Sequence, residues 1–431
     1  MSFNIYKNTI KQNESVGIIN LGCARNLVDG QTILGGLQKR GYKIVEAEKA
    51  DVVIVNTCGF INDAKQESID TILAVIDLKK QGKVKKIIVA GCLTERYKTE
   101  LVEEFKNEVD SFVGVQQLNE TNFFDQMSLT PSHFAYLKIC ESCYNLCNFC
   151  IIPKIKGKFS SRTKEDVLKE FKSLDYRGVK EVNVIGQDIT AYGMDLYGKK
   201  ELANLLDEMA RSACNVKWIR LLYTFPSHIS DELLDVIAKY SNVCKYIDIP
   251  LQHVSDKIIK AMNRKITRIE TEDLIRKIRN KIPGVGIRTA FIVGLPGETE
   301  KEFNELCDFV KEFKFERLGV FAYSQEEGTI AYDMPEQVSE KIKNQRLDKL
   351  MAIQQEISKE VMQRFVGQTL EVLIDEPQDA DNGFYIGRSQ YDAPDVDGNV
   401  NVYSEQELKC GDIVKVKITD ATEYDLAGEV I

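Results

Sequence analysis

The apolar residues in the first part of the chain come in short runs that are separated by longer amphipathic stretches. Three runs are rich in Val and Ile, as buried strands are: VGIINL (16–21), DVVIVN (51–56) and KIIVAG (86–91). Three stretches have helical periodicity: 27–40, 62–80 and 93–105. Strands and helices that alternate at this spacing predict a doubly wound, parallel α/β domain, which we place at 14–128.

The middle of the chain repeats this alternation over a longer span. Five further runs predict strands: 181–186, 218–223, 246–251, 287–294 and 317–323. The helical stretches between them are 164–176, 202–212, 231–240 and 300–313. Roughly six strand–helix units predict a full or partial (β/α) barrel, at 129–362, with its chemistry at the carboxyl-terminal mouth.

The last part of the chain begins with a long amphipathic stretch, 336–364, whose apolar face carries Leu347, Leu350, Ile357 and Val361. Such a stripe predicts a packing surface. Short alternating runs broken by Gly, Asp and Pro follow it, and they predict a small β-barrel or sandwich at 363–431.

Composition places the chain among soluble globular proteins, since 43% of its 431 residues are hydrophobic and 29% are charged. No stretch approaches the roughly 18–20 apolar residues that a membrane helix needs. The N-terminal segment MSFNIYKNTIKQNES is polar and lacks the apolar core of a signal peptide. We therefore expect a cytoplasmic protein without a membrane partner.

Charge is spread unevenly along the chain. The net charge is −9, yet residues 364–431 alone hold five basic residues against fifteen acidic ones, a balance of −10. An acidic domain repels phosphate backbones and favours a basic partner. The alternative is a solvated acidic surface without a partner.

Eleven cysteines in a chain without export signals suggest metal binding or chemistry rather than disulfides. Three of them form the pattern Cys143-x3-Cys147-x2-Cys150, in a loop after the predicted strand AYLKI. Three thiolates can hold three irons of a cubane cluster and leave the fourth iron open, as a catalyst needs. Zinc would require further knuckles or histidines, and none of the three histidines fits. Cys140 could be a fourth ligand, but it fits the preceding strand better.

Three other cysteines share a position relative to the first three predicted strands. Cys23 follows Leu21 by two residues, Cys58 likewise follows the second strand, and Cys92 comes directly after the third. The carboxyl ends of parallel strands lie on one edge of a sheet, where ligands bind. We therefore expect the three thiols to converge, the alternative being three unrelated buried thiols.

The spacing of the cysteine loop, together with Phe149, resembles the radical S-adenosylmethionine superfamily. The resemblance implies that the open iron binds the methionine part of the cofactor, and that an electron from the cluster produces a 5′-deoxyadenosyl radical. It also implies that Phe149 lies near the adenine, although a packed loop aromatic is an alternative.

Two further cofactor contacts are implied by the same resemblance. The Gly-Gly-Glu-like motif of the superfamily corresponds here to Gly186-Gln187-Asp188, which departs from the usual pattern. Arg220 on a later strand could meet the carboxylate or ribose of the cofactor, or could form a barrel salt bridge instead.

The resemblance extends to the methylthiotransferases over almost the whole chain. It rests on LGCARNLVDG, VNTCGFINDA, VAGCLTER, YLKICESCYNLCNFCIIP and IDIPLQHVSDKIIKAMNR. It implies two [4Fe-4S] clusters, one held by Cys23, Cys58 and Cys92 and the other by Cys143, Cys147 and Cys150. The N-terminal cluster would supply or bind the inserted sulfur, and a second S-adenosylmethionine would give the methyl group. Ser142 replaces the glycine that commonly precedes the first loop cysteine, and we expect this change to be tolerated.

The family divides between enzymes that modify a tRNA adenosine and enzymes that modify the β-carbon of an aspartate in small ribosomal subunit protein S-twelve. The final domain resembles the TRAM module, and its acidic balance favours the protein-modifying branch. The segments LGCARNLVD near the N-terminus and GRSQYDAPDVDG in the final domain also resemble that branch. This reading requires a flavodoxin-like or similar electron donor and a sulfur source, and no direct nucleic-acid binding. A tRNA methylthiotransferase and a non-catalytic iron–sulfur carrier are the alternatives.

Two other features lie near the predicted barrel mouth. His253 could contact substrate or cofactor, or could form a structural hydrogen bond. The turn Gly294-Leu295-Pro296-Gly297-Glu298-Thr299 could approach the cofactor, or could be a tight strand-to-helix connection in which Thr299 caps the helix.

Overall fold

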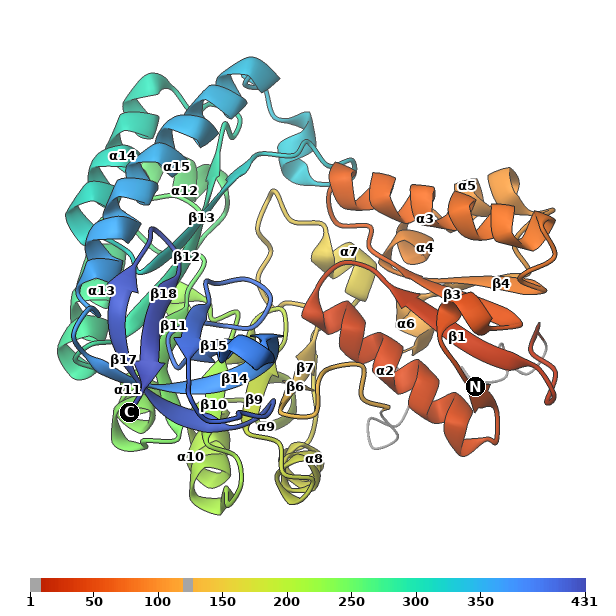
Figure 1. The fold of residues 1–431 in the computed structure, drawn as a ribbon. Coiled ribbons are helices and arrows are strands. Elements are labelled where there is room, and N and C mark those ends of the chain that lie inside the picture. The colour runs from red at the N-terminus through yellow and green to blue at the C-terminus, as the bar shows by residue number, and fades with distance from the viewer. Residues whose placement is uncertain (1–8, 119–126) are drawn as a thin grey trace.

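The computed structural model describes residues 9–118 and 127–431, which build three main sheets in chain order (Figure 1). The N-terminal α/β region, red to orange in Figure 1, lies beside the green to cyan barrel strands and their helices. The blue C-terminal barrel packs against the same core, and the yellow segment with α7 (Ile152–Lys156) lies towards the N-terminal region. Among the described residues, no helix combines the length and the apolar character needed to cross a bilayer.

The N-terminal sheet is parallel, with strand order β2-β1-β3-β4-β5. Its strands are β1 (Ser15–Asn20), β2 (Lys43–Ile44), β3 (Val52–Thr57), β4 (Lys86–Gly91) and β5 (Ser111–Gly114). Its helices are α2 (Ala24–Lys39), α3 (Asn62–Lys80), α4 (Cys92–Arg96), α5 (Lys98–Phe105) and α6 (Val115–Leu118).

Both faces of this sheet are covered because β3 is buried on each side. Val52 and Ile54 pack with residues of α2, and Val53 and Val55 pack with residues of α3 and α5. This arrangement confirms the predicted doubly wound fold. The single helix predicted over 93–105 is wrong: Tyr97, with φ −130° and ψ 36°, separates α4 from α5.

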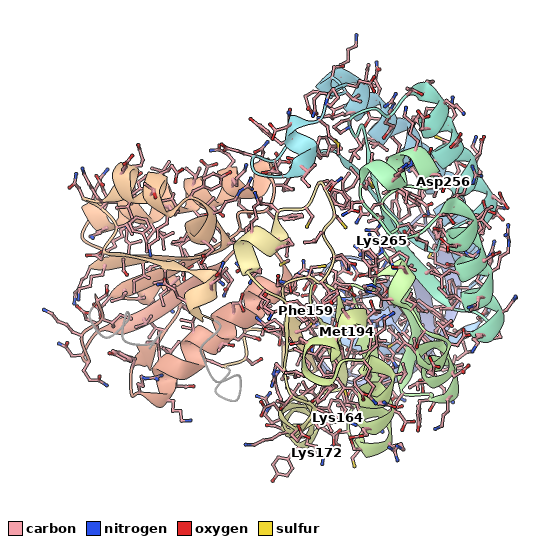
Figure 2. The ribbon with its side chains drawn as sticks, turned by 180° about the vertical axis from the view of Figure 1, so that it is seen from behind. Phe159, Lys164, Lys172, Met194, Asp256 and Lys265 are labelled. Carbon is pink, nitrogen blue, oxygen red and sulfur yellow. The ribbon has the colours of Figure 1, made fainter. Side chains whose placement is uncertain are left out.

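The core is an open sheet of six parallel strands in the order β13-β12-β11-β10-β9-β6, and therefore a partial barrel. Its strands are β6 (Phe134–Lys138), β9 (Glu181–Ile185), β10 (Trp218–Leu221), β11 (Val243–Asp248), β12 (Gly286–Val293) and β13 (Arg317–Ala322). Its main helices are α8 (Lys164–Tyr176), α10 (Leu202–Ser212), α11 (Asp231–Lys239), α12 (Asp256–Ala261), α13 (Arg268–Lys281) and α14 (Glu300–Phe313). Figure 2 shows the core from behind, with Lys164 and Lys172 on α8 and Asp256 on α12. The sequence predicts a full or partial (β/α) barrel, and the structure has the partial form.

The C-terminal region is connected to the core by the long helix α15 (Glu340–Gln363). Leu350, Ile357 and Val361 on this helix are buried, as the apolar stripe predicts. Five strands then close into a barrel in the order β14-β15-β16-β18-β17. They are β14 (Thr369–Asp379), β15 (Phe384–Ser389), β16 (Val400–Tyr403), β17 (Ile413–Ala421) and β18 (Leu426–Val430).

One segment of the C-terminal barrel, 390–397, covers the inner side of the core sheet. Alternate residues such as Val182 and Val184 pack towards the helices, so the residues between them face the opposite side. On that side Asp392 pairs with Arg317, and Asp397 accepts a hydrogen bond of 2.6 Å from Tyr246 Oη. We call 390–397 the plug segment.

Candidate functional site

Three cysteines follow strands that end at one edge of the N-terminal sheet. Cys23 directly precedes α2, Cys58 directly follows β3, and Cys92 is the first residue of α4. Strand order 2-1-3-4-5 reverses between β1 and β3, which is the place where such sheets form a ligand-binding crevice. The backbones of these residues lie close together: a Cβ at Gly22 would meet the Cys58 side chain, and a Cβ at Gly59 would lie 3.0 Å from the carbonyl carbon of Cys92.

Close packing at this edge leaves room only for glycine before Cys23. Gly22 has φ +82°, and a Cβ there would lie 2.9 Å from Sγ of Cys58. The LGC sequence therefore has a direct physical reason: the backbone at position 22 lies against the neighbouring thiol.

The second group of thiols, Cys143, Cys147 and Cys150, lies in the loop between β7 (Cys140–Glu141) and α7. The Asn145 backbone N–H and side-chain Nδ2 donate to Cys143 Sγ at 3.4 and 3.6 Å. N–H donors to sulfur are a feature that tunes iron–sulfur clusters. Asn148 fastens the loop to the core, because its Nδ2 donates to the Ala261 carbonyl at 2.8 Å.

Ser142 shows why glycine is common at this position. Its φ is 65°, in the left-handed region that favours glycine. Its Oγ donates a hydrogen bond of 2.6 Å to the carbonyl of Gly157, which helps hold this conformation.

Burial keeps most of these thiols protonated when no metal is bound. It raises the pKa of Cys143 to about 11 and the pKa values of Cys92 and Cys150 to about 12. At Cys23 burial also raises the pKa, but the Arg25 charge and the Asn26 N–H outweigh it, and the net pKa is lowered. Iron must therefore displace protons from most of the thiols.

The type of donor at these two sites fits an iron–sulfur cluster. Within 9–118 and 127–431, no three His, Cys, Asp or Glu side chains are close enough to share one metal ion. In a cubane each thiolate binds a different iron, so the ligand sulfurs stay apart. Two sets of three thiols without histidine are a donor set that suits [4Fe-4S] clusters; Cys23, Cys58 and Cys92 would hold one, and Cys143, Cys147 and Cys150 would hold the other.

An arginine accompanies each set of thiols, and sequence reasoning missed both. Arg25 donates to the Gly186 carbonyl at 3.1 Å, its charge acts to lower the pKa of Cys23, and its guanidinium lies 4.2 Å from the ring centroid of Tyr223. Arg264 donates to the Pro250 carbonyl at 2.7 Å, and its charge acts to lower the pKa of Cys147, which burial raises. Their signals in the sequence were weak: Arg25 is two residues from a cysteine, and Arg264 ends the AMNR segment.

The Gly186-Gln187-Asp188 segment borders the cysteine loop. Gly186 follows β9, and Gln187 Nε2 donates to Glu141 at 2.8 Å. Asp188 Oδ2 accepts from Asn145 Nδ2 at 2.8 Å, which fixes the asparagine that donates to Cys143. Cys140 lies beneath this segment, buried in β7, and its thiol donates to the Asp188 carbonyl at 3.6 Å.

The remaining residues considered for cofactor binding fall into two groups. Phe149 is half-buried against a cluster that includes Met262 and Leu295, so it lies at the loop as expected. Arg220 is fully buried and pairs with Glu181 at 2.8 Å, and it also donates to the Gln390 carbonyl at 2.8 Å. For Arg220 the structure shows the alternative role, a salt bridge inside the barrel.

His253 and the Gly294–Thr299 turn have structural contacts. Nδ1 of His253 accepts from the Ser255 N–H at 3.0 Å, and burial lowers the pKa of the imidazole to about 3. Glu298 Oε2 accepts from the Gly294 N–H at 2.8 Å, which closes the turn. Thr299 caps α14 in a capping box with Glu302, as predicted.

A buried ion network lies beside both sets of thiols. Asp29 on α2 pairs with Lys138 on β6 and with Lys156 on α7, and both lysines also pair with Glu141. All four side chains are buried. This network joins the N-terminal region to the core, because Asp29 lies on α2 of the N-terminal region and Lys138 lies on β6 of the core sheet.

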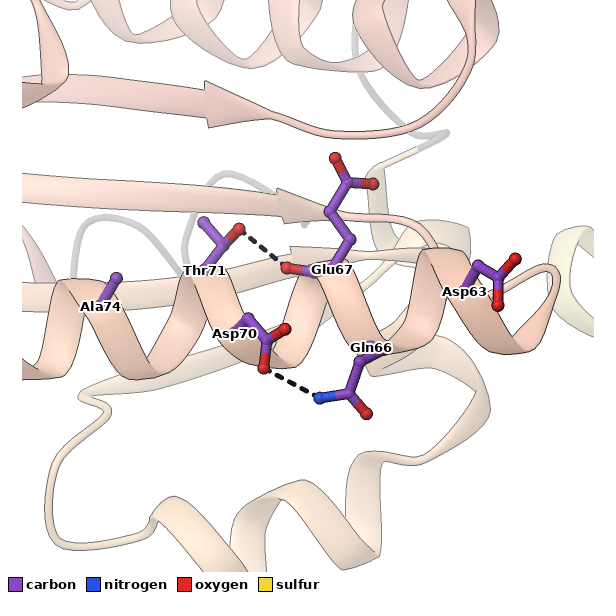
Figure 3. A pocket seen from close by; sticks show the side chains of 6 residues that line it. All are labelled: Asp63, Gln66, Glu67, Asp70, Thr71 and Ala74. Carbon is purple, nitrogen blue, oxygen red and sulfur yellow. Dashed lines mark hydrogen bonds between the residues drawn. The ribbon is translucent and has the colours of Figure 1, made fainter.

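A hollow of about 640 Å³ on the N-terminal region has a lining different from that of the thiol sites (Figure 3). It lies along α3 and is lined by Asp63, Gln66, Glu67, Asp70, Thr71 and Ala74. In Figure 3 these side chains stand along one face of the helix, with Gln66 bonded to Asp70. The hollow contains no thiol or imidazole, so we assign it no part in the chemistry.

Comparison with known families agrees with this division of the chain. Residues 137–310 match the radical SAM superfamily, 15–114 match the uncharacterized protein family UPF0004, and 366–431 match the TRAM domain. The chain is 48% identical to the ribosomal protein uS12 methylthiotransferase RimO of Clostridioides difficile, over 96% of this chain and 98% of that one. It is 44% identical to the RimO of Cytophaga hutchinsonii, over 97% and 98% of the two chains.

The chain belongs to the RimO family of methylthiotransferases. It is therefore a radical SAM enzyme, and that superfamily implies a [4Fe-4S] cluster and S-adenosylmethionine. Among solved structures, the radical S-adenosylmethionine methyltransferase TsrM from Kitasatospora setae is similar, with a TM-score of 0.54 and 15% identity. This similarity covers 71% of this chain and 72% of that one, and it concerns the fold alone.

Proposed function

We propose that this chain inserts sulfur and a methyl group at the β-carbon of an aspartate of ribosomal protein uS12, with two [4Fe-4S] clusters. The observation that carries the proposal is the pair of three-thiol sites, one at the edge of the N-terminal sheet and one at the loop beside the barrel. Relatives that are 43–48% identical over nearly the whole chain are named uS12 methylthiotransferases.

The six cysteines have two roles in this proposal. Cys143, Cys147 and Cys150 would hold the cluster that binds S-adenosylmethionine, and Cys23, Cys58 and Cys92 would hold the second cluster. When bound, a reduced cluster and the cofactor supply a radical strong enough to remove hydrogen from an unactivated carbon.

The protein would orient these groups through residues that surround the loop. Asn145 donates to the sulfur of Cys143, which holds that thiol in place, and the Arg264 charge acts on Cys147. Phe149, Gly186 and Gln187 border the loop and are proposed contacts of the cofactor. We assign Arg220 a structural role, because it donates to Glu181 and to the Gln390 carbonyl of the plug segment.

The C-terminal barrel supports a protein substrate over RNA. Its exposed acidic side chains include Glu371, Glu376, Asp379, Asp381, Glu405, Glu407, Asp412, Asp420 and Glu429. Its exposed basic side chains are the four residues Arg364, Lys409, Lys415 and Lys417. A surface with this excess of carboxylates attracts a basic ribosomal protein and repels a phosphate backbone. A flavodoxin-like electron donor, a sulfur source and a cytoplasmic location complete the proposal.

The test is a reaction of the purified enzyme with S-adenosylmethionine, a reductant, sulfide and either uS12 or total tRNA. We expect the mass of the uS12 peptide to rise by one methylthio group in place of one hydrogen, with tRNA unchanged. Modification of tRNA alone would replace the proposal with the tRNA branch. Clusters that pass to acceptor proteins, without formation of 5′-deoxyadenosine, would support an iron–sulfur carrier.

Replacement of Cys143, Cys147 and Cys150 by Ala separates the two sites. We expect this variant to lose cofactor cleavage and to keep the iron and sulfide of one cluster. Loss of both clusters in this variant would contradict the division into two sites.

A further inference from the structure

Arg25 belongs to the N-terminal region, yet its side chain contacts the carboxyl ends of two core strands. Its Nη1 donates to the Gly186 carbonyl at 3.1 Å, and Gly186 directly follows β9. Its guanidinium lies 4.2 Å from the ring centroid of Tyr223, which is two residues beyond the end of β10. Arg25 is also the second residue after Cys23, so its charge lies where the thiol-bearing edge of the N-terminal sheet meets the mouth of the core.

The backbone of Tyr223 holds this aromatic ring in place. Its φ is 65°, a conformation that is rare for a bulky residue and persists only where the surroundings fix it. Asp248 fixes it here, because its Oδ2 accepts a hydrogen bond of 2.9 Å from the Tyr223 N–H. A strained residue held against a cation is the kind of pre-organisation that is found at binding sites.

The Arg25 charge is not neutralised by an acid of this chain. Within 9–118 and 127–431, no Asp or Glu oxygen lies within ion-pair distance of its guanidinium. The carboxylates on the neighbouring segments are already paired, Glu141 with Lys138 and Asp248 with Arg288. Arginine has five N–H donors, so its hydrogen bond to a carbonyl leaves others available. Arg25 is therefore a half-buried cation without an acidic partner.

The substrate of the proposed reaction brings a carboxylate to this place. The β-carbon of an aspartate is bonded directly to the γ-carboxylate, so an anion lies next to the carbon that receives the sulfur. A carboxylate that leaves water needs a cation and hydrogen-bond donors, because burial of an unpaired charge is unfavourable. Arginine supplies both, in a planar fork that matches a carboxylate.

We propose that Arg25 binds the γ-carboxylate of the target aspartate and thereby selects an acidic residue at the reacting position. The inference rests on the proposed function, because it takes uS12 as the substrate. The acidic C-terminal barrel would attract the basic protein as a whole, and Arg25 would recognise the one acidic side chain that reacts. Tyr223 would orient the guanidinium through the contact with its ring.

The experiment measures how well the enzyme distinguishes aspartate from asparagine, which has nearly the same shape and no charge. The two ligands are uS12 and a uS12 variant in which Asn replaces the target aspartate. Their dissociation constants are measured with cluster-loaded wild type, Arg25→Gln and Arg25→Lys, at matched iron and sulfide content. Lys65→Gln is the matched control, because Lys65 is also a cation of the N-terminal region that contacts the core, through Glu326 at 2.9 Å.

The wild type is expected to bind the Asp form about tenfold more tightly than the Asn form, since a charge-assisted hydrogen bond is lost with Asn. Arg25→Gln should lower this preference below about threefold, mainly by weakening the binding of the Asp form. Arg25→Lys keeps the charge but not the fork, so the preference should fall without vanishing. Lys65→Gln should keep the wild-type preference, because loss of an interface contact does not distinguish the two side chains.

A preference in Arg25→Gln equal to that of the wild type overturns the inference, as does a wild type that binds both forms equally. Weaker binding of S-adenosylmethionine in Arg25→Gln, with the preference for Asp intact, would assign Arg25 to the cofactor and also overturns it. If Arg25→Gln does not fold, as judged by circular dichroism, Arg25→Lys decides: a reduced preference supports the inference, and an unchanged one overturns it.

Failure of the proposed function gives a different result. In that case the wild type, with Arg25 intact, would add no methylthio group to uS12 by mass spectrometry, and the inference would fall with it. If the wild type modifies uS12 and Arg25→Gln keeps the full preference for Asp, the methylthiotransferase proposal stands and the role of Arg25 alone is refuted.

Discussion

Asp29 and Lys156 come from different regions of the chain, and they form a buried ion pair in which Nζ lies 2.8 Å from Oδ2. The second oxygen of Asp29 pairs with Lys138, so one carboxylate from α2 accepts from two lysines of the core. Removal of one partner from a buried pair leaves an uncompensated charge, which costs more than the pair itself contributes.

Asp29→Ala should therefore destabilise the protein by roughly 3–5 kcal/mol, because Lys138 and Lys156 lose a shared partner. The measurement is the midpoint of urea unfolding, followed by circular dichroism. Asp70→Ala on the exposed face of α3 is the control, and we expect it to cost less than about 1 kcal/mol. Equal losses for the two variants would contradict the role of the buried network.

Gly186→Ala tests the close approach between Gly186 and Cys140. A Cβ at position 186 would lie 2.4 Å from Cys140 Sγ, so the added methyl group should cost about 1–3 kcal/mol. Cys140→Ala removes that sulfur, and the double variant should regain most of the lost thermal stability. The single variant Cys140→Ala should keep the full iron content of the protein. A loss of iron in this variant would show that Cys140 is a cluster ligand.

Alkylation of the metal-free protein tests the pKa difference between Cys23 and Cys92. Both side chains are half-buried, but the pKa of Cys23 is lowered, whereas burial raises the pKa of Cys92 to about 12. The thiolate is the reactive form, so iodoacetamide at pH 8 should modify Cys23 well before Cys92. Peptide mass spectrometry at timed intervals measures the order, and Arg25→Gln should slow the reaction at Cys23.

His253 should make stability depend on pH. Burial lowers its pKa from the ordinary value of 6.5 to about 3, so the folded protein keeps the neutral form. An unfolded chain takes up a proton below pH 6.5, and this contribution to stability is present above that pH and is lost as the pH falls towards 3. The slope is at most about 1.4 kcal/mol per pH unit.

The measurement is urea unfolding of the wild-type protein and of His253→Gln at several pH values between about 7.5 and about 5. In this range the histidine of the unfolded chain takes up its proton. The variant should lose less stability than the wild type on acidification. Parallel curves for the two proteins would show that His253 is not protonated on unfolding.

Much of the fold could be predicted from the sequence because parallel strands are buried on both faces. β3 is buried at all six positions, and such strands are continuous apolar runs that can be recognised locally. The position of Cys23, Cys58 and Cys92 after such runs then placed the three thiols on one edge. Local patterns were sufficient in these cases because the strand end and the cysteine are neighbours in the chain.

The partners of the polar residues could not be predicted in the same way. Arg25 meets Gly186 across 161 positions of sequence, and Arg220 meets Gln390 across 170. Periodicity contains no information about such contacts. The sequence therefore could not decide whether Arg220 forms a salt bridge or contacts the cofactor, and the positions of Arg25 and Arg264 beside the thiols were missed. The break at Tyr97 was also missed, since the apolar spacing continues across it.

The plug segment has a consequence for how this enzyme can be divided into parts. Asp392 and Asp397 neutralise Arg317 and Arg288, which lie on the inner side of the core sheet. A core cut off after α15 would present these arginines, together with Arg220, without their C-terminal partners. The final module is thus part of the interior of its neighbour. A C-terminal module taken from a relative would therefore have to bring carboxylates that match Arg288 and Arg317. The internal packing of the core, as well as the exposed surface, limits which modules this core can accept.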